Sequence, residues 1–218
     1  MRRSPADCRR GMIALYHCRD ARSFRALWAL EELGLDYTLD VLPFPPRARS
    51  EGFKDINPLG TVPALIADGH LMTESAAIPH FLATRYGPSA LAVAPDEAAY
   101  PVYLNFLHMG EATLTFPQTI YLRYSRFQPG RADAAAQDYA EWFGSRLRNA
   151  EGMMGPEFAC AGRFTMADIS VGYAVMLALS IGLDEQVTPG MRLYFERLSQ
   201  RDAFMRAKAR QGPGAIAT

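Results

Sequence analysis

Residues 57–78 read NPLGTVPALIADGHLMTESAAI, and this stretch decides the fold. A strand-like apolar piece runs up to the dipeptide Asp68-Gly69, and a second piece, residues 71–73, follows it. Asp-Gly between two such pieces predicts a tight hairpin, because the turn needs a positive φ at both central residues. Glu74-Ser75 then opens a predicted helix that ends near residues 86–87. The stretch therefore predicts two antiparallel strands followed by a helix.

The chain before this stretch predicts a βαβ unit. Residues 12–16 (MIALY) form a short apolar run that is typical of a buried strand. A helix is expected between Ser23, a favoured N-cap residue, and Gly34, a favoured C-cap residue. Residues 37–41 alternate apolar and polar side chains as a strand does, and residues 42–46 (LPFPP) should break regular structure. The predicted order is βαβ, loop, ββα, with a mixed four-stranded sheet.

After residue 87 the apolar residues recur at helical spacing, which predicts an all-helical second part. Thr165 and Asp168 form a variant capping box, with Asp in place of the usual Glu, and open an apolar helix expected at the centre of this part. Pro117 should kink or break the first long helix. The helices are expected at residues 96–124, 134–154, 169–179, 188–198 and 202–210.

The composition is that of an ordinary globular protein, with 49% hydrophobic and 21% charged residues. Lys and Arg number 23, as do Asp and Glu, and a formal charge of zero argues against a general nucleic-acid binder. The three cysteines, Cys8, Cys18 and Cys160, are too few for a disulfide framework and suit a reducing compartment. With no apolar segment long enough for a membrane span, we expect a cytoplasmic protein. Residues 1–11 carry four Arg and one Asp without periodicity, which predicts a disordered extension.

Four motifs carry a resemblance to a known family. They are residues 16–35 (YHCRDARSFRALWALEELGL), 57–65 (NPLGTVPAL), 68–78 (DGHLMTESAAI) and 164–169 (FTMADI). Each motif alone is weak, but in this order and at this spacing they resemble the glutathione transferases. The resemblance implies an α/β thioredoxin-like N-terminal domain over residues 12–86, a linker over 87–95 and an all-α helical C-terminal domain over 96–212.

The resemblance also implies which residues bind glutathione, an anionic tripeptide that serves as co-substrate. Val62-Pro63 resembles the family's cis-proline dipeptide, whose backbone N–H and C=O pair with the cysteinyl part of glutathione. Glu74 and Ser75 match the pair that holds the γ-glutamyl end, although without the family Ser75 would be interpreted as a plain N-cap. Among the cations of the preceding loop, Arg49 falls nearest the family's basic contact for the glycyl carboxylate.

The group that stabilises the glutathione thiolate is expected in the turn between the first strand and the first helix. The resemblance places Arg22 where beta-type bacterial relatives have a cysteine, and Ala21 where serine-type relatives often have a serine. Ser23 is the first candidate, as a hydrogen-bond donor, and Arg22 is the second, as a positive charge. Ser23 could equally be a structural N-cap. Cys18 could form a mixed disulfide with glutathione, but it lies near the end of the strand.

The predicted function is that of a glutathione transferase, which activates the thiol for attack on a small apolar electrophile or for reduction of a disulfide or peroxide. His108, Met109 and Phe116 are expected to line the electrophile pocket, although Met and aromatic residues at helical spacing more often indicate core. The scattered histidines predict no metal site. The family implies a homodimer. The alternative is a non-catalytic homologue that binds glutathione or another protein.

Overall fold

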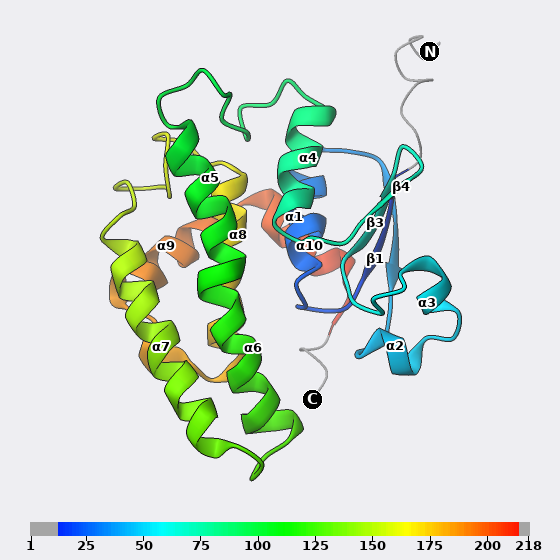
Figure 1. Cartoon of the computed structure of the whole chain (residues 1–218). Coiled ribbons are helices and arrows are strands. Elements are labelled where there is room, and N and C mark those ends of the chain that lie inside the picture. Colours follow the sequence, from blue (N-terminus) through cyan, green and yellow to red (C-terminus); the bar gives the residue numbers. More distant parts are fainter. Residues whose placement is uncertain (1–12, 214–218) are drawn as a thin grey trace.

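The structure is a computed structural model that describes residues 13–213, so the extension expected at residues 1–11 lies outside the described residues. A sheet part comes first, followed by a helical part (Figure 1). The sheet part consists of β1 (Ile13–His17), α1 (Phe24–Leu33), β2 (Tyr37–Val41), α2 (Pro46–Arg49), α3 (Phe53–Ile56), β3 (Ala64–Ala67), β4 (His70–Met72) and α4 (Ala77–Arg85). Helices α1 and α4 lie between the sheet and the helical part (Figure 1).

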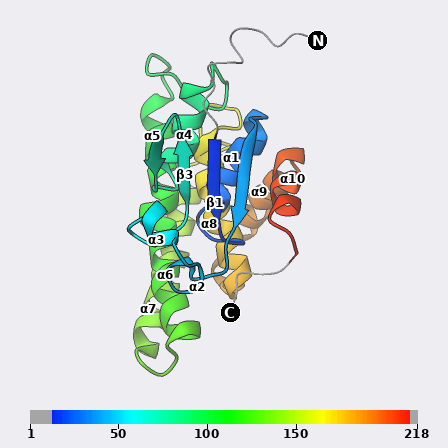
Figure 2. The same ribbon diagram turned by 90° about the vertical axis from the view of Figure 1, so that its right-hand side faces the viewer.

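The four strands form a mixed sheet in the order β2-β1-β3-β4. Strands β1 and β2 are parallel, whereas β3 runs antiparallel to both β1 and β4. Ala67 pairs with His70, so Asp68 and Gly69 form the two-residue turn, at φ values of 51° and 78°. The predicted βαβ-ββα order and the tight hairpin are therefore confirmed. Figure 2 looks onto the sheet, with most of the helices behind it.

The helical part is built around α8, which is buried along nearly its whole length. Its helices are α5 (Tyr100–Met109), α6 (Phe116–Leu122), α7 (Asp133–Glu151), α8 (Met166–Ile181), α9 (Pro189–Ser199) and α10 (Asp202–Arg210), with a 3₁₀ turn at Asp184–Gln186. Both hydrogen bonds of the capping box are present between Thr165 and Asp168, as predicted. Helix α10 returns to the sheet part, where Phe204 meets Trp28 edge to face at 5.0 Å.

Two predictions about irregular segments need correction. Of the two alternatives for Pro117, a kink or a break, the break does not occur. The chain stays helical from Tyr100 to Phe127, with a π-helical segment (Gly110–Thr115) before the proline and a second one (Arg123–Phe127) after α6. A proline has no N–H and its ring crowds the preceding turn, which a wider turn accommodates. In the loop after β2 only residues 42–45 are irregular, since Pro46 begins α2. No helix among residues 13–213 is long and apolar enough to cross a membrane.

Candidate functional site

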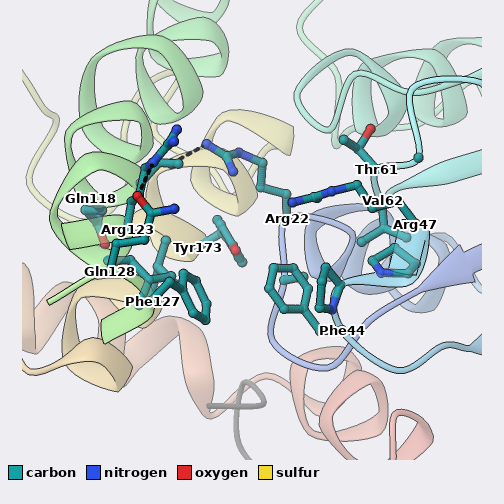
Figure 3. Close-up of a pocket in the computed structure, with 17 residues that line it drawn as sticks. Arg22, Phe44, Arg47, Thr61, Val62, Gln118, Arg123, Phe127, Gln128 and Tyr173 are labelled. Atoms are coloured by element: carbon teal, nitrogen blue, oxygen red, sulfur yellow. Dashed lines mark hydrogen bonds between the residues drawn. The ribbon is translucent and has the colours of Figure 1, made fainter. Parts of the chain in front are cut away.

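A cavity of about 550 Å³ lies between the sheet part and the helical part (Figure 3). Its volume is typical of small-molecule sites, which span roughly 300–1,000 Å³. The sheet part contributes Ala21, Arg22, Phe44, Pro45, Pro46, Arg47, Gly60, Thr61 and Val62, and the helical part contributes Gln118, Thr119, Leu122, Arg123, Phe127, Gln128, Tyr173 and Leu177. Three of these 17 residues are Arg and none is Asp or Glu, so the cavity attracts anions.

Arg22 stands just before α1 and crosses the cavity towards the helical part (Figure 3). Its Nε donates to Glu111 Oε1 at 2.6 Å, and one Nη donates to Thr119 Oγ1 at 2.6 Å. A guanidinium carries five N–H groups, and the other Nη of Arg22 has no partner among the described residues. A third of the side chain is exposed. Arg22 is therefore held in place while it keeps N–H donors for a ligand.

Arg25, one turn further along α1, is fully buried and binds the same carboxylate. Its Nη1 donates to Glu111 Oε2 at 2.5 Å and to Ser75 Oγ at 3.0 Å. The remaining N–H groups reach Thr115 Oγ1 and the backbone oxygens of residues 110 and 170, at 2.8–3.3 Å. The guanidinium also lies 4.3 Å from the centre of the Tyr173 ring. Arg25 thus ties the sheet part to the helical part directly behind the cavity.

Glu111 is the shared anion of this cluster. Burial by itself opposes ionisation of its carboxyl group, but the guanidinium groups of Arg25 and Arg22 outweigh that effect and lower its pKa. The carboxylate is therefore negative at neutral pH and is surrounded by two cations. The cluster of Arg22, Arg25 and Glu111 carries one net positive charge beside the cavity.

Ser23 belongs to a buried hydrogen-bond chain instead of the cavity wall. Its Oγ lies 2.8 Å from His17 Nδ1, and His17 Nε2 lies 2.9 Å from Gln211 Oε1. The Asp20 N–H donates to the same Gln211 oxygen, and Gln211 Nε2 donates to Asp20 Oδ1, which fixes the orientation of the amide. His17 Nε2 must therefore be the donor. Burial lowers the pKa of His17 to about 4, so the ring is neutral and its Nδ1 is an acceptor.

This chain argues against Ser23 as the thiolate donor. The hydroxyl hydrogen of Ser23 is donated to His17 Nδ1, while Cys18 N–H donates to the Ser23 oxygen at 3.2 Å. Ser23 is also fully buried and does not line the cavity. Its hydroxyl makes no side-chain cap of α1 either. Ser23 instead braces the turn that carries Arg22.

Cys18 is equally unsuited to a reactive role. Its side chain is fully buried and its Sγ faces Pro43 O at 3.8 Å. Burial raises the pKa of the Cys18 thiol to about 12, so the thiolate is scarcely populated at neutral pH. Cys18 packs with Phe53, Val62 and Ala64 beneath the sheet-part loops. The mixed-disulfide hypothesis has no geometric basis here.

The residues expected to hold glutathione lie at different distances from the cavity. Val62 is on its wall, and the Val62–Pro63 peptide bond is cis, as the resemblance implied. Ser75 is buried behind the cavity, where it accepts from Arg25 and donates to Glu111. Glu74 is exposed and does not line the cavity. Ser75 is thus linked to the cavity indirectly, by its hydrogen bonds to Arg25 and Glu111.

Of the two loop arginines Arg47 and Arg49, Arg47 lines the cavity and Arg49 is exposed outside it. Gly60 makes this approach possible, since a Cβ at Gly60 would lie 2.7 Å from Arg47 Cβ. Gly60 also has a φ of 63°, which side chains rarely adopt. The segments that contain Gly60 and Arg47 can therefore pack against each other, which places Arg47 at the cavity wall.

The three residues expected to line the electrophile pocket do not line this cavity. His108 is exposed, and Met109 packs against the core. Phe116 is 48% exposed and contacts the Tyr139 ring at 6.3 Å. The cavity wall is formed further along the same helical stretch, in α6 and the second π-helical segment. Among residues 13–213 no group of three possible metal ligands comes together.

The structure adds functional residues that the sequence patterns did not indicate. Glu111, Arg25 and Arg123 belong to the site or brace it, and none was a candidate. A weak signal existed for Arg25, because a charged residue among the apolar residues of α1 requires a buried partner. Arg123 gave no signal, since its position depends on the π-helical turn before α6.

Comparisons with known proteins find similarity to glutathione transferases. Residues 21–85 match the family described as "Glutathione S-transferase, N-terminal domain". Glutathione S-transferase 3 of Schizosaccharomyces pombe is 36% identical over 103 residues, which cover 47% of this chain and only 43% of that protein. Glutathione S-transferase 1 of Manduca sexta is 28% identical over 172 residues, which cover 76% of this chain and 75% of that protein.

Solved structures share the complete two-part fold. A sphingomonad glutathione S-transferase complexed with glutathione superposes with a TM-score of 0.80 and 25% identity, covering 92% of this chain and all of that one. The bacterial glutathione transferase BphK, in a ternary complex, gives a TM-score of 0.81 at 22% identity. The fold and the cavity define a thioredoxin-like domain joined to a helical domain, with an anion-attracting cavity between them. The chain is similar to glutathione transferases over both of its parts, and that family's N-terminal domain model matches residues 21–85.

Proposed function

We propose that this protein binds glutathione in the cavity between its two parts and stabilises its thiolate, which then attacks an electrophile. The observation that carries the proposal is the position of Arg22 at the junction of the two parts, where one of its Nη groups has no hydrogen-bond partner among the described residues. A transferase of this kind must bind an anionic peptide and raise the fraction of its thiol that is ionised. Both walls of the cavity carry arginine side chains, and none of the residues that line it is Asp or Glu.

The thiolate is stabilised by charge in this proposal. Arg22 directs one positive group into the cavity, and the first residues of α1 add the positive end of the helix dipole. A cation close to a thiol favours its ionised form and so lowers its pKa from about 8.5. A larger thiolate fraction at neutral pH speeds attack on carbon electrophiles or disulfides. In this proposal Arg22 stabilises the thiolate, because the Ser23 hydroxyl hydrogen is already donated to His17.

The tripeptide would lie against the sheet-part wall. Val62 offers its backbone as an added edge for the cysteinyl unit, in the strand-addition mode of peptide recognition. Arg47 would bind the glycyl carboxylate, since it lines the cavity where Arg49 does not. The γ-glutamyl end would approach the start of α4 near Glu74 and Ser75, where the Glu111 cluster supports the loop.

Calorimetry with two neighbouring arginine variants tests the binding part. Arg47→Gln should weaken glutathione binding about tenfold, because hydrogen bonds to charged groups contribute about 1.5–3 kcal/mol. Arg49→Gln is the matched control and should change the dissociation constant less than about twofold. Equal effects of both variants, or none, would rule out the Arg47 contact. Absence of glutathione binding by the unaltered protein would end the proposal.

A non-catalytic homologue remains the second candidate, and a specific observation favours it. The Ser23 hydroxyl is committed to His17, and Cys18 is buried, so the turn offers no hydroxyl or thiol to the bound sulfur. Conjugation of an activated aryl halide separates the candidates. The transferase proposal expects turnover that depends on Arg22, whereas the binding homologue would bind glutathione without turnover on a broad panel of electrophiles.

The proposal further includes a homodimer that detoxifies electrophiles in the cytoplasm, with glutathione as co-substrate. A light-scattering mass of twice 24.1 kDa supports the dimer, and a mass of 24.1 kDa contradicts it.

A further inference from the structure

We infer that the electrophile taken by this site is aromatic and carries a carboxylate, whereas the sequence predicted a small apolar electrophile. The inference rests on the proposed function and concerns the wall of the cavity that the tripeptide leaves free. That wall comes from the second π-helical segment and the residue after it. Figure 3 shows Arg123, Phe127 and Gln128 together on this side, opposite Arg47 and Val62.

The charges of the cavity exceed those of glutathione. Arg22, Arg47 and Arg123 line it, and within residues 13–213 the only acidic group bonded to any of them, Glu111, is shared with the buried Arg25. The cavity and its ion cluster therefore carry about three net positive charges. Glutathione with its thiol ionised has two carboxylates, one thiolate and one ammonium, which give a net charge of minus two. One positive charge is left without a counter-charge when the tripeptide is bound.

Arg123 is the cation that glutathione leaves unpaired. Among residues 13–213 neither Arg47 nor Arg123 forms an ion pair. The Nε of Arg123 makes one long hydrogen bond, to Gln128 Oε1 at 3.5 Å, and its guanidinium lies 5.6 Å from the Tyr124 ring. Its N–H donors are available for a planar anion, and a guanidinium binds a carboxylate through two parallel hydrogen bonds. The amide of Gln128 stands beside it as a second polar group.

The aromatic part of the substrate follows from the ring pair beside Arg123. Phe127 of the helical part stacks on Phe44 of the sheet part, with ring centres 6.0 Å apart and an interplanar angle of 24°. Phe127 is nevertheless 46% exposed, so the pair presents apolar ring surface next to a cation. A planar arene carboxylate matches both features, since its ring packs on the aromatic pair and its anion reaches Arg123.

The step itself leaves the carboxylate unchanged. The glutathione thiolate attacks the ring carbon that bears a halide, a C–S bond forms, and the C–halide bond breaks as the halide leaves with the bonding electrons. The thiol proton goes to solvent before attack. Arg123 binds substrate and product alike, so it sets the choice of electrophile, and Arg22 acts on the sulfur.

The test compares two electrophiles that differ only in charge, 4-chloro-3-nitrobenzoate and 4-chloro-3-nitrobenzamide. Each kcat/KM is divided by the uncatalysed rate with glutathione, which removes the intrinsic difference in ring activation. The unaltered protein should prefer the carboxylate about tenfold, and Arg123→Gln should reduce that ratio to near one. Arg126→Gln, an exposed arginine of the same segment outside the cavity, is the matched control and should keep the preference.

Binding of the two product conjugates gives a readout that needs no turnover. The S-aryl glutathione with the carboxylate should bind about tenfold more tightly than its carboxamide analogue, and Arg123→Gln should remove the difference. Equal affinities in the unaltered protein, or a preference that survives in Arg123→Gln, would overturn the inference while glutathione binding stands. Failure to bind glutathione and both conjugates would overturn the proposed function and the inference together.

Discussion

Replacing Glu111 with Gln should destabilise the protein strongly, because within residues 13–213 the substitution removes the only carboxylate bonded to a fully buried arginine. Arg25 has no exposed side-chain surface, and Glu111 accepts from it at 2.5 Å and from Arg22 at 2.6 Å. The amide introduced by Glu111→Gln would keep one acceptor oxygen, but its NH₂ group would face two guanidinium groups. The buried cation would then have only neutral acceptors.

Breaking a buried ion pair by removing one partner costs about 3–5 kcal/mol. We expect the lower end of this range, about 3 kcal/mol, because Arg25 keeps its hydrogen bonds to Ser75, Thr115 and two backbone oxygens. For a protein of this size, such a loss lowers the thermal midpoint by roughly 6–12 °C. Glutathione binding should weaken as well, since Arg22 loses its anchor.

Calorimetric melting of purified protein at neutral pH measures the effect. Glu97→Gln is the matched control, because Glu97 pairs with Arg163 where about a third of each side chain is exposed. Its melting midpoint should move little. If Glu111→Gln and Glu97→Gln lower the midpoint equally, the buried ion cluster does not hold the two parts together as described.

The pH dependence follows from the same cluster. The folded pKa of Glu111 lies below its ordinary value, so its stabilising contribution is fully present above the unfolded pKa of about 4.3 and is lost as the pH falls through the folded pKa. The difference in thermal midpoint between the unaltered protein and Glu111→Gln should therefore become smaller below about pH 4. A gap that widens in acid would contradict the assigned direction of the pKa.

Three further outcomes follow from the buried polar groups. Ser23→Ala should lower the free energy of unfolding in urea by about 1–3 kcal/mol, because His17 Nδ1 and the Cys18 N–H lose their partner. It should change the glutathione dissociation constant less than about twofold. A large loss of turnover with unchanged stability would restore Ser23 as the thiolate donor. Asp168→Ala should lower the free energy of unfolding by at least about 3 kcal/mol, because the carboxylate accepts from the Ala159 and Thr165 N–H groups and from a buried tyrosine. A urea midpoint within error of that of the unaltered protein would contradict this. Cys18 should resist alkylation in the native state at neutral pH and react fully in urea, as peptide mapping would show, whereas rapid native labelling would contradict its burial.

Most of the fold could be predicted because it depends on local chemistry. The Asp68-Gly69 turn needs two positive φ angles, and Asp-Gly supplies them at low cost. The Thr165–Asp168 box marks the start of α8 through bonds that span three residues. Gly34 ends α1 in the left-handed conformation. Each of these signals is complete within a few neighbouring residues.

The site depended on distant residues and was predicted less well. The fate of the Ser23 hydroxyl is decided by His17 and by Gln211, which lies 194 positions from His17 in the chain. Spacing along the chain contains no information about such a partner. Ser23 therefore lies in the expected turn, but its burial and its hydrogen-bond partners argue against a role as thiolate donor.

The three residues expected at the electrophile pocket do not line the cavity, for a geometric reason. His108 and Met109 lie ahead of the π-helical segment Gly110–Thr115, and Phe116 follows it. A π-turn holds more residues than an α-turn, so every side chain after it is rotated relative to a regular helix. Helical periodicity therefore assigned the wrong face of this stretch to the cavity. The face actually presented contains Thr119, Leu122 and Arg123.

If Arg22 stabilises the glutathione thiolate by charge, as proposed, the thiol pKa of the bound tripeptide must depend on Arg22. Ultraviolet difference absorbance of the thiolate, followed across pH with the protein in excess, gives that pKa. We expect a pKa at least about one unit below that of the free thiol for the unaltered protein and a return towards the free value in Arg22→Gln. A bound thiol that titrates as it does in water, or a lowered pKa that persists in Arg22→Gln, would refute the role proposed for Arg22.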